Sequence, residues 1–226
     1  QELNERADTI FGDTPLKLLY LPSIDYTRIN EIEDDAIWKK KIIGKADVEI
    51  AKLIQRLNIN DWVNEGRSYL LEDETCPFCQ EKTISQEFRK QLEGYFDESF
   101  TKDTTSVKDG NEEYIRLFEN LLNQLQHIES REKLNKDTKL DLDKFTAYVK
   151  TLSSQFVSNK EFLNSKTKEP SRSIDLISTK EQLDEIVVLI GAANALITKH
   201  NDIVSNYPTE RTNLINDIWK FLIEEN

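Results

Sequence analysis

Apolar residues recur every three or four positions through most of this chain, while turn-forming residues are scarce. A clear run lies between residues 112 and 130, where the apolar positions are Ile115, Phe118, Leu121, Leu122, Leu125 and Ile128. Such spacing places the side chains on one face of an α-helix. With only 6 Gly and 5 Pro in 226 residues, the chain lacks the turn chemistry of an all-β fold. We therefore predict an all-α fold of antiparallel helical bundles or coiled-coil arms, with a small Cys-x-x-Cys turn.

The same spacing predicts further helices, separated by polar segments. The predicted helices cover residues 29–43, 48–57, 61–69, 83–100, 112–130, 140–163, 180–205 and 208–222. Expected boundary signals are Asp47, Thr83-x-x-Gln86 and Ser178-x-x-Glu181 as N-terminal caps, Pro208 in a first turn, and Gly44 as a C-terminal stop. Segments 101–110 and 166–173 are polar and are predicted to be a loop and a linker. The apolar run 16–22 predicts a strand or an extended lead-in.

These patterns suggest four parts along the chain. Residues 1–27 form a lead-in segment, residues 28–100 a helical region with the Cys-x-x-Cys turn, residues 101–173 a helical insertion, and residues 174–226 returning helices. Two asparagines, Asn194 and Asn201, fall on or beside the apolar seam of the helix at 180–205. They either set the register of a helix pair or flank the seam and face water.

Charge and hydropathy limit the classes of partner. The formal net charge of −12 argues against direct nucleic-acid binding by this chain, because phosphate contacts need clustered Lys and Arg. The run Lys39-Lys40-Lys41 fits a solvated helix face better than a basic patch. No apolar stretch approaches the roughly 20 residues that span a bilayer, and the start at Gln1 does not resemble a signal peptide. We therefore expect no membrane partner, a cytoplasmic location and, since Met is absent, a piece of a longer protein.

The run Cys76-Pro77-Phe78-Cys79 is the one constellation with metal-ligand spacing. Two thiolates can hold one Zn²⁺ ion, which requires four ligands in a tetrahedron. A second copy of the chain could supply the other two ligands, as could His127 and His200. Three interpretations stay open: a zinc half-site at Cys76 and Cys79 closed by a partner chain, a metal-free structural knuckle, and a redox pair. The redox pair normally sits in a strand–helix context that is missing here.

Sequence signatures of catalysis are absent. The chain contains no phosphate-binding loop, no dinucleotide-binding glycine pattern and no nucleophile elbow. Its 2 histidines lie far apart in sequence, which disfavours a catalytic triad. We therefore expect that this chain is not an enzyme by itself. The aromatic residues Trp62, Phe78 and Tyr95 are predicted to pack in a small core and not to contact a ligand.

The order Asp61-Trp62-Val63, Gly66, Cys76-Pro77-Phe78-Cys79 and Tyr95-Phe96-Asp97 resembles the middle region of AAA-type ATPases related to the RloC and PrrC anticodon-nuclease systems. Further similarity lies in Gly44-x-x-Asp47-Val48, Asn194, His200-Asn201 and Trp219. The resemblance covers roughly residues 28–100 and 174–226, whereas residues 101–173 show none. One departure is Gln80, because the family usually has Gly directly after the second cysteine, where Gly eases a knuckle turn.

This resemblance implies a helical insertion within an ATPase whose ATP site lies in flanking regions outside the chain. It also implies a homodimer in the full-length protein, with arms joined through one zinc ion shared between two chains at Cys76 and Cys79. The leading hypothesis is a non-catalytic region of a defence or DNA-repair ATPase that couples arms or dimerises. The alternative is a protein-binding sensor that recognises a phage or host protein, with specificity in residues 101–173.

Overall fold

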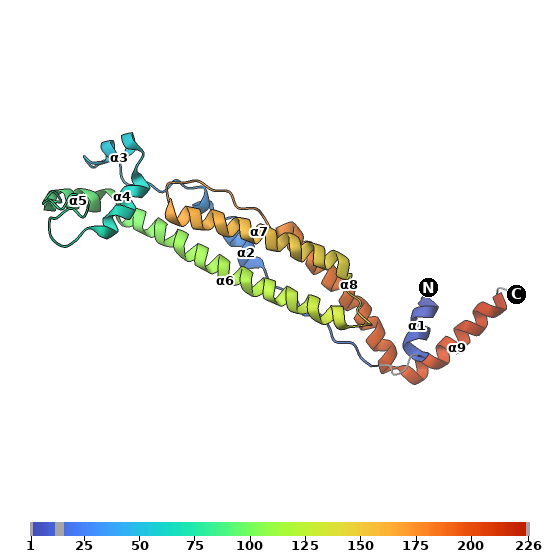
Figure 1. The fold of residues 1–226 in the computed structure, drawn as a ribbon. Coiled ribbons are helices and arrows are strands. Elements are labelled where there is room, and N and C mark those ends of the chain that lie inside the picture. Colours follow the sequence, from blue (N-terminus) through green and yellow to red (C-terminus); the bar gives the residue numbers. More distant parts are fainter. Residues whose placement is uncertain (1, 12–15, 225–226) are drawn as a thin grey trace. The chain divides into compact units, whose positions relative to one another are not determined.

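The computed structural model describes residues 2–11 and 16–224, and these residues form helices joined by irregular segments, with no β-strand among them (Figure 1). The all-α prediction is confirmed. The α-helices are α1 (Glu2–Phe11), α2 (Thr27–Glu33), α3 (Ala51–Leu57), α4 (Asn60–Gly66), α5 (Gln86–Tyr95), α6 (Glu98–Leu134), α7 (Leu142–Lys168), α8 (Lys180–Ser205) and α9 (Tyr207–Glu224). Two short 3-10 helices, η1 (Ala36–Trp38) and η2 (Arg67–Tyr69), follow α2 and α4.

The chain divides into two compact units, each assembled from segments far apart in sequence. Unit 1 contains Gln1–Asp25, Asn123–Thr151 and Lys180–Asn226, and unit 2 contains Tyr26–Leu122 and Leu152–Thr179. Helices α6 and α7 therefore contribute residues to both units, while the cysteine motif belongs to unit 2.

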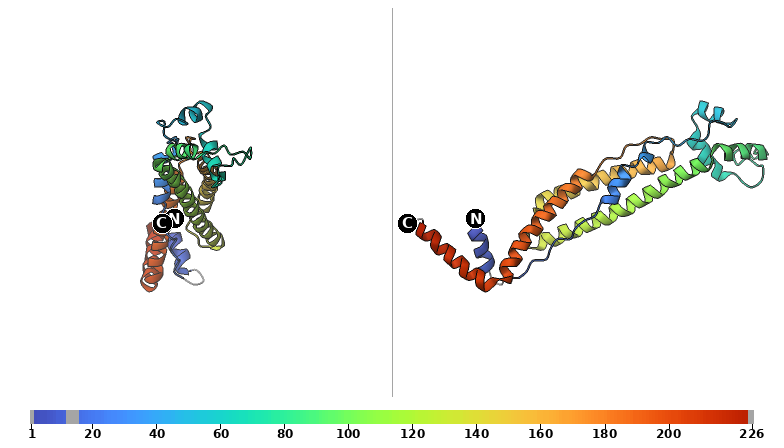
Figure 2. Two further views of the ribbon diagram at one scale, coloured as in Figure 1. Left: turned by 90° about the vertical axis from the view of Figure 1, so that its left-hand side faces the viewer. Right: turned by 180° about the vertical axis from the view of Figure 1, so that it is seen from behind.

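The core of unit 2 forms where the first part of α6 lies beside the last part of α7, as seen from several sides in Figures 1 and 2. The rings of Phe118 and Phe156 stack with centroids 4.8 Å apart, and Tyr114 lies 5.4 Å from Phe118. Each of these buried aromatic side chains removes a large apolar area from water. The predicted helices at 112–130 and 140–163 are confirmed, and both are longer than predicted.

The predicted loop at 101–110 is wrong, because these residues belong to α6. The hydroxyls of Thr104 and Ser106 donate to the carbonyls of Phe100 and Lys102, four residues earlier, so the polar side chains are satisfied within the helix. At Gly110 an added Cβ would lie 3.0 Å from Cη2 of Trp38, so this glycine allows the close approach of a buried tryptophan.

The predicted helix at 29–43 is also wrong in its second half. Helix α2 ends at Glu33, and Asp35 then takes an extended conformation and caps η1 by accepting from the Ile37 N–H. The indole of Trp38 is buried and donates to the Ile32 carbonyl. Gly44 does not stop a helix, since it lies against the ring of Tyr95, which leaves no room for a Cβ.

Other predicted boundaries need correction because tertiary contacts decide them. Helix α3 begins at Ala51 without a cap from Asp47, and Ser85, not Thr83, caps α5 by accepting from the Phe88 N–H. Helix α5 ends at Tyr95, so Phe100 lies on the next helix. The helices predicted at 61–69 and 180–205 and the position of Pro208 in the first turn of α9 are confirmed.

The predicted linker at 166–173 begins inside α7 and contains a buried lysine. The Lys166 ammonium donates to the carbonyls of Lys40, Pro170 and Arg172, with the Pro170 distance at 2.8 Å. Burial lowers the pKa of Lys166, but three carbonyl acceptors replace the lost water. This side chain therefore fastens the end of α7 to the segment after η1.

A half-buried carboxylate connects α2 with α6 and with the segment before α8. Glu33 accepts from the Tyr114 hydroxyl at 2.9 Å and from both the N–H and the hydroxyl of Thr179, each at 2.9 Å. Asn159 donates to the Tyr114 oxygen at 2.9 Å and also pairs with the backbone of Ile177. Burial raises the pKa of Glu33, and the three donors oppose that shift.

Unit 1 is centred on α8, whose Leu183, Ile186 and Ile190 are buried. Helix α1 packs against both α8 and α9. The run 16–22 is an extended segment and not a strand. Asn194 and Asn201 bond to the backbone of that segment, so neither predicted role, setting the register of a helix pair or facing water, is correct. Within the described residues, no helix is both long and apolar enough to cross a membrane.

Candidate metal half-site

The cysteine motif lies on a short turn between η2 and α5. An antiparallel bridge between Thr75 and Lys82 closes the base of the turn. Inside it, the Cys76 N–H donates to the Glu81 carbonyl at 2.8 Å, and the Gln80 N–H donates to the Cys76 carbonyl at 2.9 Å. These bonds hold the two cysteines on one compact loop.

Arg89 of α5 anchors the segment that enters this turn. Its guanidinium donates to the carbonyl of Asp73 at 2.5 Å and also to the carbonyl of Leu71. The N–H of Ile84 donates to the Glu74 carbonyl at 2.9 Å, and the Ile84 side chain is buried. Arg89 of α5 therefore holds the entry to the cysteine turn, and the Ile84–Glu74 bond joins its two ends.

Both cysteines are free thiols, Cys76 half-buried and Cys79 exposed. The backbone N–H groups of Cys79 and Phe78 donate to the Cys76 sulfur, and these bonds lower the pKa of the Cys76 thiol. The side chains of Cys79 and Thr83 add weaker contributions. Backbone amides aimed at a sulfur also favour a thiolate bound to a metal.

Gln80 takes the conformation that the turn requires, although it is not glycine. Its φ of 61° lies in the left-handed region, which costs a non-glycine residue roughly 1–2 kcal/mol. Its side-chain amide donates to the Pro77 carbonyl at 2.9 Å. Glutamine at this position therefore leaves the turn closed.

The donor set fits half of a zinc site. Two thiols separated by two residues match the sulfur ligands that Zn²⁺ prefers. Across the part of the chain that the structure describes, no group of three or more His, Cys, Asp or Glu side chains is arranged to hold a metal ion. His200 is engaged in unit 1, where its Nε2 lies 3.0 Å from the Leu16 carbonyl oxygen. Among the described residues, Cys76 and Cys79 therefore have no third or fourth ligand beside them.

The aromatic residues near the motif do not all pack as predicted. Tyr95 is buried, and its hydroxyl donates to the Asn60 side chain at 3.2 Å, which confirms its packing role. Trp62 and Phe78 are exposed, with rings 6.2 Å apart. The prediction that these two residues lie in a core is wrong, because the turn is too short to cover them.

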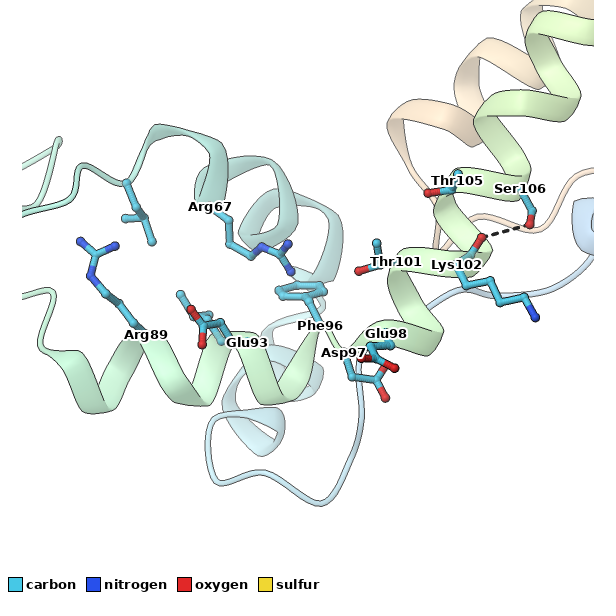
Figure 3. A pocket seen from close by; sticks show the side chains of 12 residues that line it. Arg67, Arg89, Glu93, Phe96, Asp97, Glu98, Thr101, Lys102, Thr105 and Ser106 are labelled. Atoms are coloured by element: carbon cyan, nitrogen blue, oxygen red, sulfur yellow. Dashed lines mark hydrogen bonds between the residues drawn. The ribbon is translucent and has the colours of Figure 1, made fainter.

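A separate cavity of about 780 Å³ lies between η2, α5 and the start of α6 (Figure 3). Arg67 lies over the ring of Phe96, 4.5 Å from its centroid, and burial lowers the pKa of Arg67. Arg89 and Glu93 line the same cavity. The sequence offers no motif for it, because its residues come from η2, α5 and the start of α6 and meet only in the folded chain. The cysteines do not line this cavity.

An all-α chain with an exposed cysteine turn and no catalytic sequence motif matches the expectation of an ATPase-associated helical region. A family model described as an AAA domain, AAA_13, matches residues 1–226, and the chain belongs to this family. No curated protein matches the chain, and no solved structure does.

Proposed function

We propose that this chain is a non-catalytic helical region of an AAA-type ATPase, and that it joins two copies of the protein through one zinc ion. Cys76 and Cys79 of each copy would provide the four thiolate ligands. Nucleotide chemistry would belong to regions outside these 226 residues. When bound, zinc would supply a structural crosslink and no reaction step.

The observation that carries this proposal is the placement of two free thiols, Cys76 and Cys79, on one short turn closed by the Thr75–Lys82 bridge. The neighbouring backbone N–H groups of Cys79 and Phe78 lower the pKa of the Cys76 thiol, which favours the thiolate form that binds metal. Cys79 is exposed, so its thiol is accessible to a metal ion. The AAA_13 membership supports a role in an ATPase assembly.

The surrounding fold supports a mechanical role. The carboxylate of Glu33 and the ammonium of Lys166 tie α2, α7 and the segments beside them with several hydrogen bonds each. Buried polar groups that are fully paired rigidify the elements they connect. These contacts would keep the helices of unit 2 in a fixed arrangement if the region transmits force.

Titration of the metal-free chain with Co²⁺ tests the site, because tetrahedral thiolate coordination gives characteristic visible absorption. We expect saturation at one metal ion per two chains, and loss of the signal in Cys76→Ser and Cys79→Ser. Thr83→Ala is the matched control, since its hydroxyl lies 3.9 Å from the Cys79 sulfur but is not proposed as a ligand. Saturation of the Cys76→Ser variant at the original stoichiometry would reject the site.

A second assay tests the non-catalytic part of the proposal. We expect the purified chain to release no phosphate from ATP above the rate of a buffer blank. ATP hydrolysis that persists through further purification would contradict the non-catalytic role. It would not bear on the metal site, which the titration tests separately.

A further inference from the structure

Two large aromatic side chains lie exposed beside the cysteine turn and contact each other. Phe78, which stands between the two cysteines, is 76% exposed, and Trp62 of α4 is 60% exposed. Their ring centroids are 6.2 Å apart, with an interplanar angle of 30°. A contiguous exposed apolar surface marks an interaction site, whereas a solitary exposed apolar residue is ordinary.

The segment that carries Phe78 has an excess of acidic residues. Residues 72–82 contain four acids and one base, all exposed: Glu72, Asp73, Glu74, Glu81 and Lys82. Two identical surfaces with this excess of negative charge repel each other when they are brought together. In the absence of a metal ion, this repulsion therefore opposes association of two copies through the aromatic pair.

We infer that Trp62 and Phe78 form, together with the cysteine turn, a self-complementary contact between two copies of this chain that closes only around a metal ion. This inference rests on the zinc site proposed above, and it names the surface that the zinc ion brings together. The partner is a second copy because each chain supplies only two of the four ligands.

A shared ion brings the turn that carries Phe78 close to the other copy. Zinc–sulfur bonds are about 2.3 Å long, so the two cysteine turns must touch. A contact between identical surfaces is symmetric, and a residue near its axis meets the same region of the other copy. Phe78 lies between the two ligands in sequence, and Trp62 is in contact with Phe78. Both side chains are thus placed to lose water when the ion binds.

Metal control follows from the balance between apolar burial and charge. Two aromatic side chains from each copy form a small surface, well below the roughly 1,200 Å² of a stable interface. Repulsion between the acidic residues weakens it further. The ion supplies positive charge and four metal–sulfur bonds, so the dimer forms with metal and separates without it.

Sedimentation equilibrium with Zn²⁺ present tests the contact. We expect Phe78→Ala and Trp62→Ala each to raise the dimer Kd by about tenfold or more, since buried aromatic residues dominate small interfaces. Because both side chains are exposed, these variants should fold normally. Trp219→Ala on α9 is the matched control, because Trp219 is 62% exposed and its loss should leave the dimer Kd unchanged.

Charge variants test the control by metal. We expect Glu74→Gln combined with Glu81→Gln to lower the zinc-linked dimer Kd several-fold at low salt, and we expect added salt to lower the wild-type Kd as well. If the acidic residues instead made attractive contacts across the dimer, the double Gln variant and added salt would both raise the dimer Kd.

The outcomes separate the contact from the zinc site. A zinc-linked dimer with the same Kd in wild type, Phe78→Ala and Trp62→Ala overturns the aromatic contact and leaves the zinc site standing. A chain that binds no zinc, or that binds zinc only as a monomer, overturns both. A dimer that forms equally well in Cys76→Ser without metal overturns the control by metal.

Discussion

The side-chain amide of Asn194 pairs with both backbone groups of Leu21: its oxygen accepts from the Leu21 N–H at 2.8 Å, and its nitrogen donates to the Leu21 carbonyl at 3.0 Å. Asn201, two helical turns further along α8, repeats this pairing on Leu18, at 2.8 Å and 2.9 Å. The extended segment 16–22 is thus held through its backbone by a helix and not by a neighbouring strand.

Replacing both asparagines by alanine should release this segment. The double variant loses four hydrogen bonds, and we expect it to lower the free energy of unfolding of unit 1 by roughly 2–4 kcal/mol. Hydrogen exchange should show lost protection at the Leu18 and Leu21 amides. Asn213→Ala, at an exposed position of α9, is the control and should change neither quantity. Unchanged protection in the double variant would show that these bonds do not hold the segment.

Glu33 should make stability depend on pH in a defined direction. Burial raises its pKa above the ordinary value of 4.5, so the folded state holds the proton more tightly than the unfolded chain. Its contribution is therefore fully present below pH 4.5 and is lost as pH rises through the raised pKa. Glu33→Gln removes this titration. Urea unfolding at several pH values should show the stability of wild type relative to Glu33→Gln falling as pH rises, and then levelling.

A control variant for the pH dependence of Glu33 lies on the same helix. Glu31→Gln changes an exposed carboxylate of α2 that pairs with Arg28, and it should not reproduce the trend. If the stability of wild type relative to Glu33→Gln rose with pH over the same range, the assignment of Glu33 as the responsible buried group would be incorrect.

Lys166→Met should destabilise unit 2 strongly. The methionine fills much of the space but leaves the carbonyls of Lys40, Pro170 and Arg172 without their donor. We expect a loss of roughly 3 kcal/mol, because buried acceptors without partners keep their desolvation cost. Lys168→Met, two residues later at an exposed position, should change the free energy of unfolding by no more than about 0.5 kcal/mol. Equal effects of the two variants would refute the carbonyl cluster.

Gln80→Gly should stabilise the cysteine turn. Glycine adopts a φ near the observed 61° without steric cost, whereas glutamine is sterically strained at this φ. We expect a gain of about 1 kcal/mol, partly offset by loss of the bond to the Pro77 carbonyl. Zinc affinity should rise in parallel, and Gln80→Ala should show no such gain. A weaker zinc affinity in Gln80→Gly would argue against a turn organised for metal.

The Cys76 thiol should ionise at a lower pH in the folded chain than in the unfolded chain. The backbone N–H groups of Cys79 and Phe78 stabilise its thiolate, and only the thiolate reacts with an alkylating agent. Iodoacetamide labelling of Cys76, followed by mass spectrometry over a pH series with and without urea, measures this difference. A folded-state curve at higher pH than the unfolded-state curve would contradict it. Bound zinc should suppress the labelling.

The apolar pattern was sufficient to predict the long helices, because spacing of three and four residues reflects burial along one face. It failed at 101–110, where Thr104 and Ser106 satisfy their hydroxyls within the helix and polar composition does not reveal this. It also failed at 166–173, where Lys166 is buried partly because it donates to the Lys40 carbonyl, far away in sequence. Propensity describes local preference, and these positions are decided by tertiary contacts.

Only the two cysteines of the candidate site could be predicted from the sequence. Ligand spacing identified Cys76 and Cys79 directly, since both residues lie on one turn. The exposure of Trp62 and Phe78 was not predictable, because aromatic residues are usually buried and only the shape of the turn leaves these two uncovered. The cavity beside Arg67 has no sequence signal, because its lining residues come from three helical elements.

Native mass spectrometry of the zinc-loaded chain tests the central claim most directly, because it counts chains and metal ions in the same particle. The account predicts a species with the mass of two chains and one zinc ion, which separates into single chains when a chelator removes the metal. Zinc-loaded single chains, or chains that carry no zinc at metal excess, would contradict it.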